Sequence, residues 1–331
     1  MQYDILAIGD TTIDAFIHLK DAHVHCKIDT DECELCVRFG DKVPYESVEV
    51  VPAVGNAANA AVACARLGLT SALRAYVGDD ENGKICLLSL EKDDVDTSLI
   101  VVDKSNKTNY HYVLSYGAER TILIKHEHYA YEFPFLPEEP KWIYLSSMSE
   151  GEAAMKYHQE IIDYLIAHKS VKLAFQPGTF QMKIPIEQIK GLYENAEIFF
   201  CNKEEAQRVL KTSESDIKKL LSSMRALGPK IAVITDGRNG AYLAGESGMW
   251  FAPMYPDPSP PTNRTGAGDA TASTSVAYMI LGLPPQEALL RGLINAANVV
   301  QKVGAQKGLM AREQIEEWYA KRPADFVAAP I

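Results

Sequence analysis

The sequence predicts a three-layer α/β/α protein, in which helices cover both faces of a mostly parallel central sheet, with a small β-sheet lid. Short apolar runs that favour β-strands alternate with amphipathic helical stretches, which is typical of a parallel sheet between helices. The chain has 331 residues, of which 47% are hydrophobic, enough for a large core. Two segments, residues 16–50 and 107–125, interrupt the alternation. We therefore expect one domain over residues 1–331, with a lid formed by these two insertions.

The elements of the central layer follow in chain order. Residues 5–8 predict the first strand, and residues 57–67 predict a helix that ends at Gly68. Residues 71–77 predict a strand, and residues 83–92 predict a helix. Four further buried strands are expected at residues 142–145, 171–175, 197–201 and 230–235. Two long helices are expected after a glycine-rich run, at residues 269–281 and 285–302.

The lid is expected to contain a β-hairpin. Residues 110–114 and 121–124 have the composition of two short strands, and Gly117 lies between them. Two histidines follow this hairpin, at positions 126 and 128. They point either toward a substrate or along an ordinary exposed strand face, and the second interpretation is favoured.

Charge and composition exclude several classes of function. Lys and Arg number 33 against 44 Asp and Glu, a net charge of -11, and no long basic run offsets it, so a nucleic-acid backbone would be repelled. The beginning of the chain lacks the features of a signal peptide, and no apolar run is long enough to span a bilayer. We expect a cytoplasmic protein that binds neither nucleic acid nor a membrane. Its six cysteines are expected to be thiols.

A glycine-rich run carries the strongest chemical signal. Residues 264–273 read Arg-Thr-Gly-Ala-Gly-Asp-Ala-Thr-Ala-Ser, so small residues lead into a helix with Asp269 in its first turn. Gly266 and Gly268 would let backbone amides approach a phosphate at the positive end of the helix. Asp269 could then accept the proton of an attacking hydroxyl group. The alternative is a tight loop in which Asp269 only complements the helix dipole.

Two polar elements lie next to other expected strands. Asn202 and Glu205 follow a buried strand and fit a helix capping box, but they could also organise water around Mg²⁺ and nucleotide phosphates. Asp14 follows the first strand, and Asn59 lies in the next helix, where a carboxylate and an amide could bind vicinal hydroxyl groups. Each residue could equally be a turn or capping residue.

The order of these motifs resembles that of the ribokinase-like (PfkB) family of carbohydrate and nucleoside kinases over nearly the whole chain. The matching residues are, in order, Asp14, Gly55-Asn56-x-x-Asn59, Val77-Gly78-Asp79-x-x-Gly83, Asn202-x-x-Glu205, Thr235-Asp236-Gly237-x-x-Gly240, Thr265 to Asp269 and Gly304-Ala305. The resemblance implies that Asp269 is the catalytic base and that Gly266, Ala267 and Gly268 form an anion hole. It implies a substrate site at Asp14, Gly55, Asn56 and Asn59, a nucleotide site at Asn202, Glu205, Thr235, Gly237, Gly240 and Arg264, and Mg²⁺ bound through water by Glu205.

The implied activity is ATP-dependent transfer of the γ-phosphoryl group to a hydroxymethyl group of a sugar, with Mg²⁺ as cofactor. A nucleoside kinase of the same fold and a non-catalytic sugar-binding sensor are the alternatives, and the resemblance also implies a homodimer that forms through the lid. Two features depart from the family. Asn263 replaces an Asp that commonly belongs to a K⁺ site, and Gln176-Pro177-Gly178-Thr179 replaces a charged pattern of several sugar kinases.

Two local patterns point to other chemistry. Residues 78–84 superficially fit a phosphate-binding P-loop, but Ile85 stands where a Ser or Thr should bind Mg²⁺, so a turn into a helix is expected. Cys26, Cys33 and Cys36 lie near two histidines and could bind zinc, although packing of a lid strand is the favoured interpretation.

Overall fold

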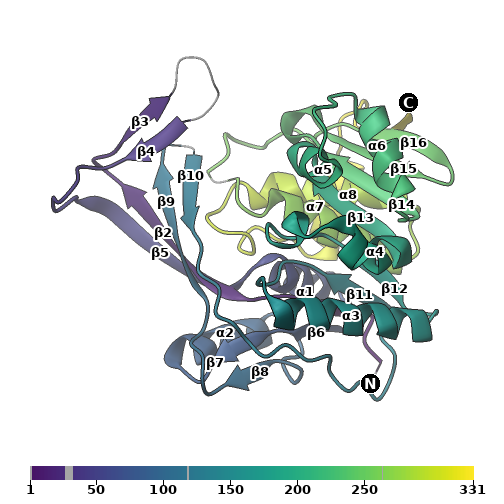
Figure 1. Cartoon of the computed structure of the whole chain (residues 1–331). Coiled ribbons are helices and arrows are strands. Elements are labelled where there is room, and N and C mark those ends of the chain that lie inside the picture. The colour runs from purple at the N-terminus through teal and green to yellow at the C-terminus, as the bar shows by residue number, and fades with distance from the viewer. Residues whose placement is uncertain (1, 27–32, 118, 263) are drawn as a thin grey trace.

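The computed structural model describes residues 2–26, 33–117, 119–262 and 264–331, and it confirms the expected α/β/α architecture (Figure 1). The central sheet has the strand order β17-β16-β15-β14-β13-β12-β11-β1-β6. Neighbouring strands from β6 to β14 are parallel, and β15, β16 and β17 extend the sheet in antiparallel fashion. The strands are β1 (Ile5–Ile8), β6 (Ser71–Arg74), β11 (Trp142–Leu145), β12 (Lys172–Phe175), β13 (Ala196–Asn202), β14 (Ile231–Thr235), β15 (Ala241–Gly245), β16 (Gly248–Ala252) and β17 (Ala329–Pro330).

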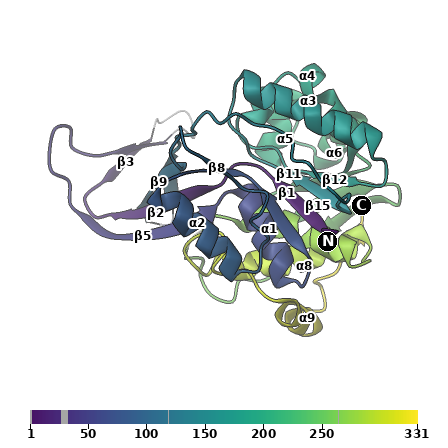
Figure 2. The ribbon, with the colours of Figure 1, turned by 90° about the horizontal axis from the view of Figure 1, so that it is seen from below.

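Helices pack on both faces of this sheet, as Figure 2 shows from below. One face carries α1 (Asn56–Arg66), α2 (Glu81–Lys92), α7 (Ala267–Ile280), α8 (Pro285–Val299) and α9 (Arg312–Ala320). The other carries α3 (Glu152–Ala167), α4 (Ile186–Asn195), α5 (Lys203–Leu210) and α6 (Ile217–Ala226). In β1, Ile5 and Ala7 pack into the first core and Leu6 and Ile8 into the second. Because successive strand residues face opposite sides, a strand buried on both faces is apolar at every position.

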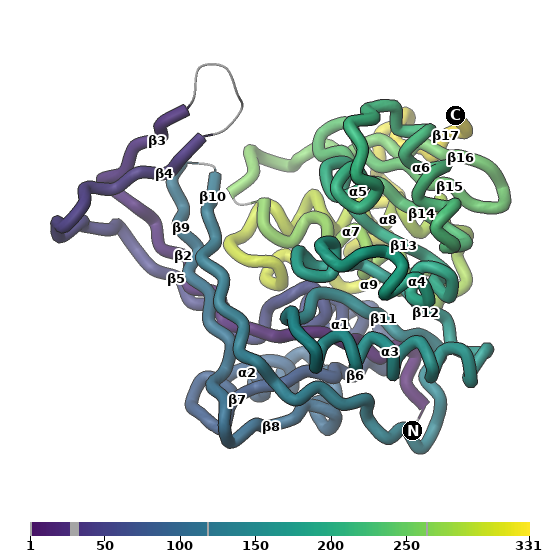
Figure 3. The backbone as a smooth tube through the Cα atoms, in the orientation of Figure 1, coloured from purple at the N-terminus to yellow at the C-terminus, as the bar shows by residue number. Residues whose placement is uncertain are grey.

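A second, four-stranded sheet projects from the body (Figure 3). Its order is β10 (Glu119–Leu123), β9 (Tyr110–Tyr116), β2 (Thr12–Leu19) and β5 (Tyr45–Val54). The predicted hairpin is β9 and β10, which pair antiparallel, whereas β2 and β9 run parallel. β2 begins before residue 16, and β5 continues past residue 50, so this small sheet reaches further into the body than the predicted insertions.

Three expectations about local structure need correction. The strand expected at residues 71–77 divides into β6, which pairs with β1, and β7 (Tyr76–Gly78), which pairs with β8 (Val101–Asp103), because Val101 donates its N–H to the carbonyl of Ala75. The helix expected at residues 285–302 ends at Val299. Helices α3, α4, α6 and α9 were not among the expected elements, whereas the capping box at Asn202 had indicated the start of α5.

The expectation that all six cysteines are thiols is wrong for one pair. The short strands β3 (His23–Cys26) and β4 (Cys33–Cys36) pair antiparallel, and Cys26 forms a disulfide with Cys33 directly opposite. Directly opposed residues share one face of a hairpin, which brings the two sulfur atoms together. Cys36 is free, and the described residues contain no cluster of three or more metal-binding side chains. No helix in the described part of the chain is both long and apolar enough to cross a bilayer.

Candidate active site

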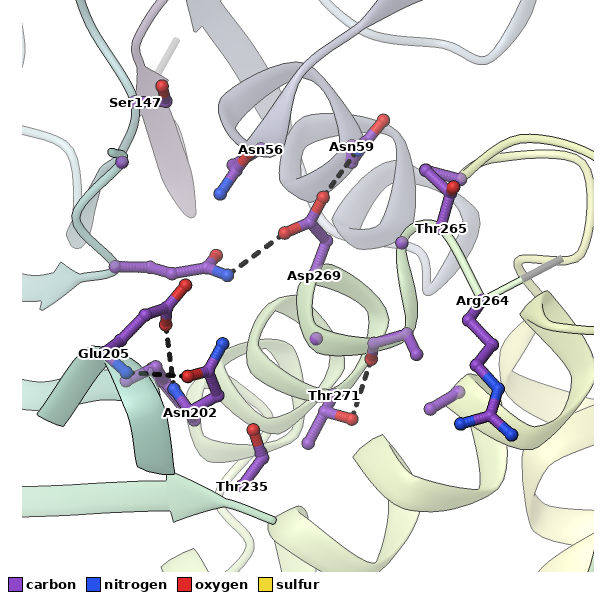
Figure 4. A pocket seen from close by; sticks show the side chains of 18 of the residues that line it. Asn56, Asn59, Ser147, Asn202, Glu205, Thr235, Arg264, Thr265, Asp269 and Thr271 are labelled. Atoms are coloured by element: carbon purple, nitrogen blue, oxygen red, sulfur yellow. Dashed lines mark hydrogen bonds between the residues drawn. The ribbon is translucent and has the colours of Figure 1, made fainter. Parts of the chain in front are cut away.

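A cavity of about 720 Å³ opens where the central strands, α7 and the small sheet meet. Polar residues at or just beyond the carboxyl ends of β1, β12, β13 and β14 line it, as expected for a ligand site in an open α/β sheet. Every residue that the sequence assigned to a site lines this one cavity: Asp14, Gly55, Asn56, Asn59, Asn202, Glu205, Thr235, Gly237, Gly240, Arg264, Gly266, Ala267, Gly268 and Asp269. Figure 4 shows how several of them lie around Asp269.

The start of α7 presents backbone amides to the cavity. No side chain caps this helix end, and the first N–H groups of a helix have no partner within the helix. Gly266 has a φ of 84°, and a Cβ there would lie 2.4 Å from the Cβ of Ala305, so both conformation and space require glycine. A Cβ at Gly268 would meet no atom within 4 Å. Gly268 also lines the cavity, so the open space beside it belongs to the cavity that an anion would enter.

Asp269 is held in place by two amide side chains. Its Oδ2 accepts a hydrogen bond of 2.7 Å from Asn59 Nδ2, and its Oδ1 accepts one of 3.0 Å from Gln176 Nε2. Gln306 donates to Asn59 Oδ1, and Tyr144 donates its hydroxyl to Gln176 Oε1. Both amides must therefore turn their N–H groups toward Asp269, which leaves the carboxyl group as an acceptor only.

Burial raises the pKa of the Asp269 carboxyl, and the negative charge of Asp14 raises it further, while the hydrogen bonds from Asn59 and Gln176 act in the opposite direction. Burial disfavours the ionised form of a carboxyl group, whereas donors stabilise it. A carboxylate with a raised pKa is a better proton acceptor than an ordinary Asp. The local environment thus suits Asp269 to general-base chemistry.

The segment after α8 is tied to α1 through the same network. Gln306 Nε2 also donates to the carbonyl of Ala53 over 2.7 Å. Arg66, at the end of α1, donates to the carbonyls of Gln306 and Leu309 over 2.6 and 3.0 Å. The orientation of Asn59, and through it that of Asp269, therefore depends on a segment far along the chain.

The capping interpretation of Asn202 and Glu205 is confirmed. Asn202 Oδ1 accepts the N–H of Glu205, and Glu205 Oε2 accepts the N–H of Asn202, both over 2.8 Å. Both side chains also line the cavity, and burial raises the pKa of Glu205. The capping box occupies only one carboxylate oxygen of Glu205. Oxygen donors of this kind fit Mg²⁺ held partly through water.

The remaining residues predicted for the nucleotide also line the cavity. Thr235 ends β14, and Gly237 and Gly240 follow it with φ of 52° and 90°. A Cβ at Gly240 would come within 2.4 Å of the carbonyl oxygen of Ala252, so the chain packs closely here. The side chain of Arg264 points away from Asp269, beyond Thr265 (Figure 4). Asn263, on which the K⁺ prediction depends, lies outside the described residues.

The small sheet forms the opposite wall. Cross-strand register pairs Asp14 with His111, and the Oδ1 of Asp14 lies 3.4 Å from His111 Nδ1. His126 is not on an exposed strand face, as had been favoured, because its Nδ1 lies 2.9 Å from Asp10 Oδ2 and its ring packs edge-on to Phe180. All five of these side chains line the cavity. His128 is exposed.

Sequence reasoning gave no site role to Gln176, His111, Arg120 or Gln306. A polar residue directly after the expected strand at residues 171–175 was the available signal for Gln176. Finding His111 and Arg120 requires the strand register, which places them on the same face of the small sheet as Asp14. Gln306 has no local signal, because its contacts depend on how the chain after α8 docks.

A sequence profile of the pfkB family carbohydrate kinases matches residues 21–312. The chain belongs to this family. The ATP-dependent 6-phosphofructokinase of Thermoanaerobacterium thermosaccharolyticum is 25% identical over 96% of this chain and 94% of that protein. The ribokinase of Bacillus subtilis is 28% identical over 85% of this chain and 92% of its own.

Solved structures of pfkB and ribokinase proteins share the fold. A putative ribokinase II from E. coli, solved in complex with ATP and Mg²⁺, superposes with a TM-score of 0.76 at 17% identity and covers 97% of this chain and 100% of its own. The predicted ribokinase-like fold and the predicted family are therefore confirmed. The family consists of carbohydrate kinases, which are phosphotransferases with an alcohol group as acceptor.

Proposed function

We propose that this pfkB kinase transfers the γ-phosphoryl group of ATP to a hydroxymethyl group of a sugar, with Asp269 as catalytic base. The observation that supports this most strongly is the position of Asp269. It lies in the first turn of α7, beside uncapped amides, and two amide side chains fix it as a hydrogen-bond acceptor. A proton acceptor next to an anion site is the arrangement that phosphoryl transfer to a hydroxyl requires.

In the proposed reaction, Asp269 takes the proton of the acceptor hydroxyl while the oxygen of that hydroxyl bonds to the γ-phosphorus. The bond from that phosphorus to the bridging oxygen breaks, and ADP leaves. The amides of Ala267 and Gly268 stabilise the charge on the transferring group, and Asp14 orients the acceptor through its other hydroxyls. Glu205, with Asn202, would hold Mg²⁺ through water, and the ion would neutralise phosphate charge when bound.

The lining also suits a purine nucleotide. Besides Thr235, Gly237, Gly240 and Arg264, it includes apolar side chains on which a base can pack: Met254, Leu293, Ala296, Ala297 and Val300. Apolar walls with a few polar groups are typical of cofactor sites. We propose ATP as donor on this basis. The replacement of the usual Asp by Asn263 argues against a requirement for K⁺, and activity with and without KCl would decide this.

A panel of sugars and nucleosides, assayed for ADP formation with ATP and Mg²⁺, tests the proposed reaction. At least one sugar should give acceptor-dependent ADP. In the Asp269→Asn variant turnover should fall by about 10²- to 10⁴-fold, the contribution of a general base, while acceptor affinity should stay within a few-fold. Comparable turnover in that variant would contradict the assignment of the base.

The same panel separates the two alternatives. Phe180 lines the cavity and packs against His126, and such a ring could stack on a base, which favours a nucleoside as the second candidate acceptor. ADP formation with nucleosides alone would identify the protein as a nucleoside kinase. A sensor would be stabilised by a sugar in thermal unfolding without forming ADP with any member of the panel.

We propose that two chains associate through the outer face of the small sheet, which also acts as a lid. Cross-strand register puts Val50 and Leu123 in one row with Tyr112, and Val48 lies in the next row. Each of these four side chains is about half exposed, at 48% to 51%. Contiguous exposed apolar side chains on a sheet typically mark an interface. Light scattering should give a dimer for the wild type and a monomer for Val50→Lys with Tyr112→Lys; a wild-type monomer would exclude the interface.

A further inference from the structure

The inner face of the small sheet carries a cation that the protein does not pair. In the cross-strand register, Arg120 of β10 lies opposite Ser115. The neighbouring pair on the same face of the sheet is Ile122 and Val113. It lines the cavity together with Asp14 and His111. Within the described residues it forms no hydrogen bond or ion pair, and its Nε is buried without a partner.

The other arginines that lie partly inside the protein are all bonded to protein oxygens. Arg66 pairs with Asp93 over 2.8 Å, and Arg291 pairs with Glu287 and Glu316. Arg74, Arg225 and Arg322 donate to backbone carbonyls. Burying an unpaired charge is unfavourable, and chains normally satisfy such a group. Arg120 is the exception among these six, and it faces a cavity.

The electrostatic environment of the Arg120 guanidinium favours binding of an anion. Burial lowers the pKa of its guanidinium, and the positive charge of Arg264 lowers it further, whereas Glu119, Asp14 and Asp269 act in the opposite direction. None of these three carboxylates reaches Arg120 to form an ion pair in the described structure. A bound anion in direct contact would compensate for the water that the guanidinium loses on burial and would offset the repulsion by Arg264.

Neighbouring polar atoms on the same face are only partly bonded. His111 Nε2 and Ser115 Oγ are buried without a hydrogen bond, and within the described residues Asp14 Oδ1 has only its 3.4 Å contact with His111 Nδ1. His111 is 9% exposed and Asp14 is 8% exposed, so neither side chain has much access to solvent. Together they offer an acceptor and donors suited to hydroxyl groups, next to a guanidinium suited to an anion.

We propose that the acceptor carries an anionic group, a carboxylate or a phosphate, in addition to its hydroxyls, and that Arg120 binds that group. This inference rests on the proposed kinase function, and it narrows the acceptor to a polyhydroxylated acid or a sugar phosphate. The transferring phosphoryl group is bound elsewhere, at the uncapped start of α7. Arg120 belongs instead to the sheet that carries Asp14, the residue assigned to the acceptor.

Matched pairs of probes test the proposal by calorimetry, with ADP and Mg²⁺ present. D-Gluconate is compared with D-glucitol for the carboxylate, and D-fructose 6-phosphate with D-fructose for the phosphate; further sugar acids and sugar phosphates are each compared with their neutral counterparts. At least one anionic member should bind about tenfold or more tightly than its neutral partner, since a hydrogen bond to a charged group contributes roughly 1.5–3 kcal/mol. The pair that shows this preference identifies the anion.

Variants then assign the preference to Arg120. Arg120→Met should weaken binding of the anionic member by roughly 10- to 100-fold and leave the neutral member within about twofold, and Arg120→Lys should restore part of the loss. Arg312→Met, which removes an exposed arginine far from the cavity lining, is the matched control and should change neither.

Three results would overturn the inference: no anion preference in any pair, equal weakening of both members by Arg120→Met, or a loss of turnover in that variant without any change in anion affinity. The last result would place Arg120 on the transferring phosphoryl group. ADP formation is measured separately. Turnover of neutral sugars without anion preference would leave the kinase function intact and reject this inference, whereas Arg120-dependent anion binding without ADP would reject the kinase function alone.

Discussion

The two walls of the cavity differ in how far the protein satisfies its own polar groups. On the body wall, Asp269 is bonded by Asn59 and Gln176, and both amides are themselves oriented by further donors. On the wall formed by the small sheet, His111 Nε2 and Ser115 Oγ are buried without a hydrogen bond. The body wall holds the side chain of its base fully bonded without a ligand and leaves only the backbone amides at the start of α7 open, whereas the small sheet leaves side-chain groups unbonded.

This difference indicates a division of labour. A base that is already oriented needs no reorganisation during transfer, which lowers the barrier for any acceptor. Unsatisfied groups are costly until a ligand with matching chemistry pairs with them, and they penalise a ligand that lacks it. We therefore propose that the body wall performs the chemistry and that the small sheet selects the acceptor.

The largest effect is expected from substitution of the two glycines at the start of α7, in the body wall. Gly266→Ala should lower turnover by at least about 10²-fold and the free energy of unfolding by at least about 1–2 kcal/mol, because φ is positive and the new Cβ meets Ala305. Gly268→Ala is the matched variant. It should keep or slightly raise stability, yet lower turnover about tenfold or more, because its methyl group enters the open space beside the amides. Unchanged turnover in Gly268→Ala would refute the anion hole.

Hydrogen exchange compares the walls directly. With the best acceptor of the panel at about 100 times its Kd, amides of β9 and β10 should exchange up to about 100-fold more slowly, because the ligand stabilises the state that binds it. Amides in the middle of α7 should change by no more than a few-fold. Equal protection of both regions would contradict the difference that we describe between the body wall and the small sheet.

The pH dependence of activity tests how Gln176 positions the base. Asp269 must be ionised to accept a proton, so kcat/KM falls as the pH drops through its pKa, which burial raises above the ordinary range. Gln176→Met removes a donor that lowers this pKa, so the acidic limb should move to higher pH, and kcat/KM at neutral pH should fall about tenfold. Gln159→Met, which removes an exposed Gln–Asp hydrogen bond in α3, is the control. An unmoved limb would mean that Gln176 is merely structural.

The smallest effect is expected at the tip of the small sheet. Cys26→Ser with Cys33→Ser removes the disulfide of the β3–β4 hairpin, whose described residues lie outside the cavity lining. Because none of the described residues of the hairpin lines the cavity, kcat/KM for the best acceptor should stay within about twofold. A larger loss, measured beside the untreated and the reduced wild type, would extend the selecting wall to this hairpin.

The central layer was largely predictable from the sequence, and the small sheet was predictable only in part. β1 and β11 have the expected bounds because each is buried on both faces and reads as an uninterrupted apolar run. The division between β6 and β7 was not predictable, since it depends on pairing with β8. β5 was expected only as part of an insertion, because its exposed apolar positions show no clear alternation.

The predicted site residues gather in one cavity because each belongs to a short motif beside a strand or helix end. Local sequence carries that information. The residues that were missed act across long separations: Gln176 reaches Asp269, and Gln306 reaches Asn59. Arg120 and His111 share a face only through strand register. Such relations arise from tertiary packing, which local patterns do not encode.

The tie from Gln306 to Asn59 also has a consequence for protein synthesis. A growing chain that has been translated through α8 already contains Asp269 and its glycines, but it lacks the amide that turns Asn59 toward the base. Arg66 likewise has no carbonyls of residues 306 and 309 to bind. The base therefore acquires its orientation only when the segment beyond α8 has emerged and docked.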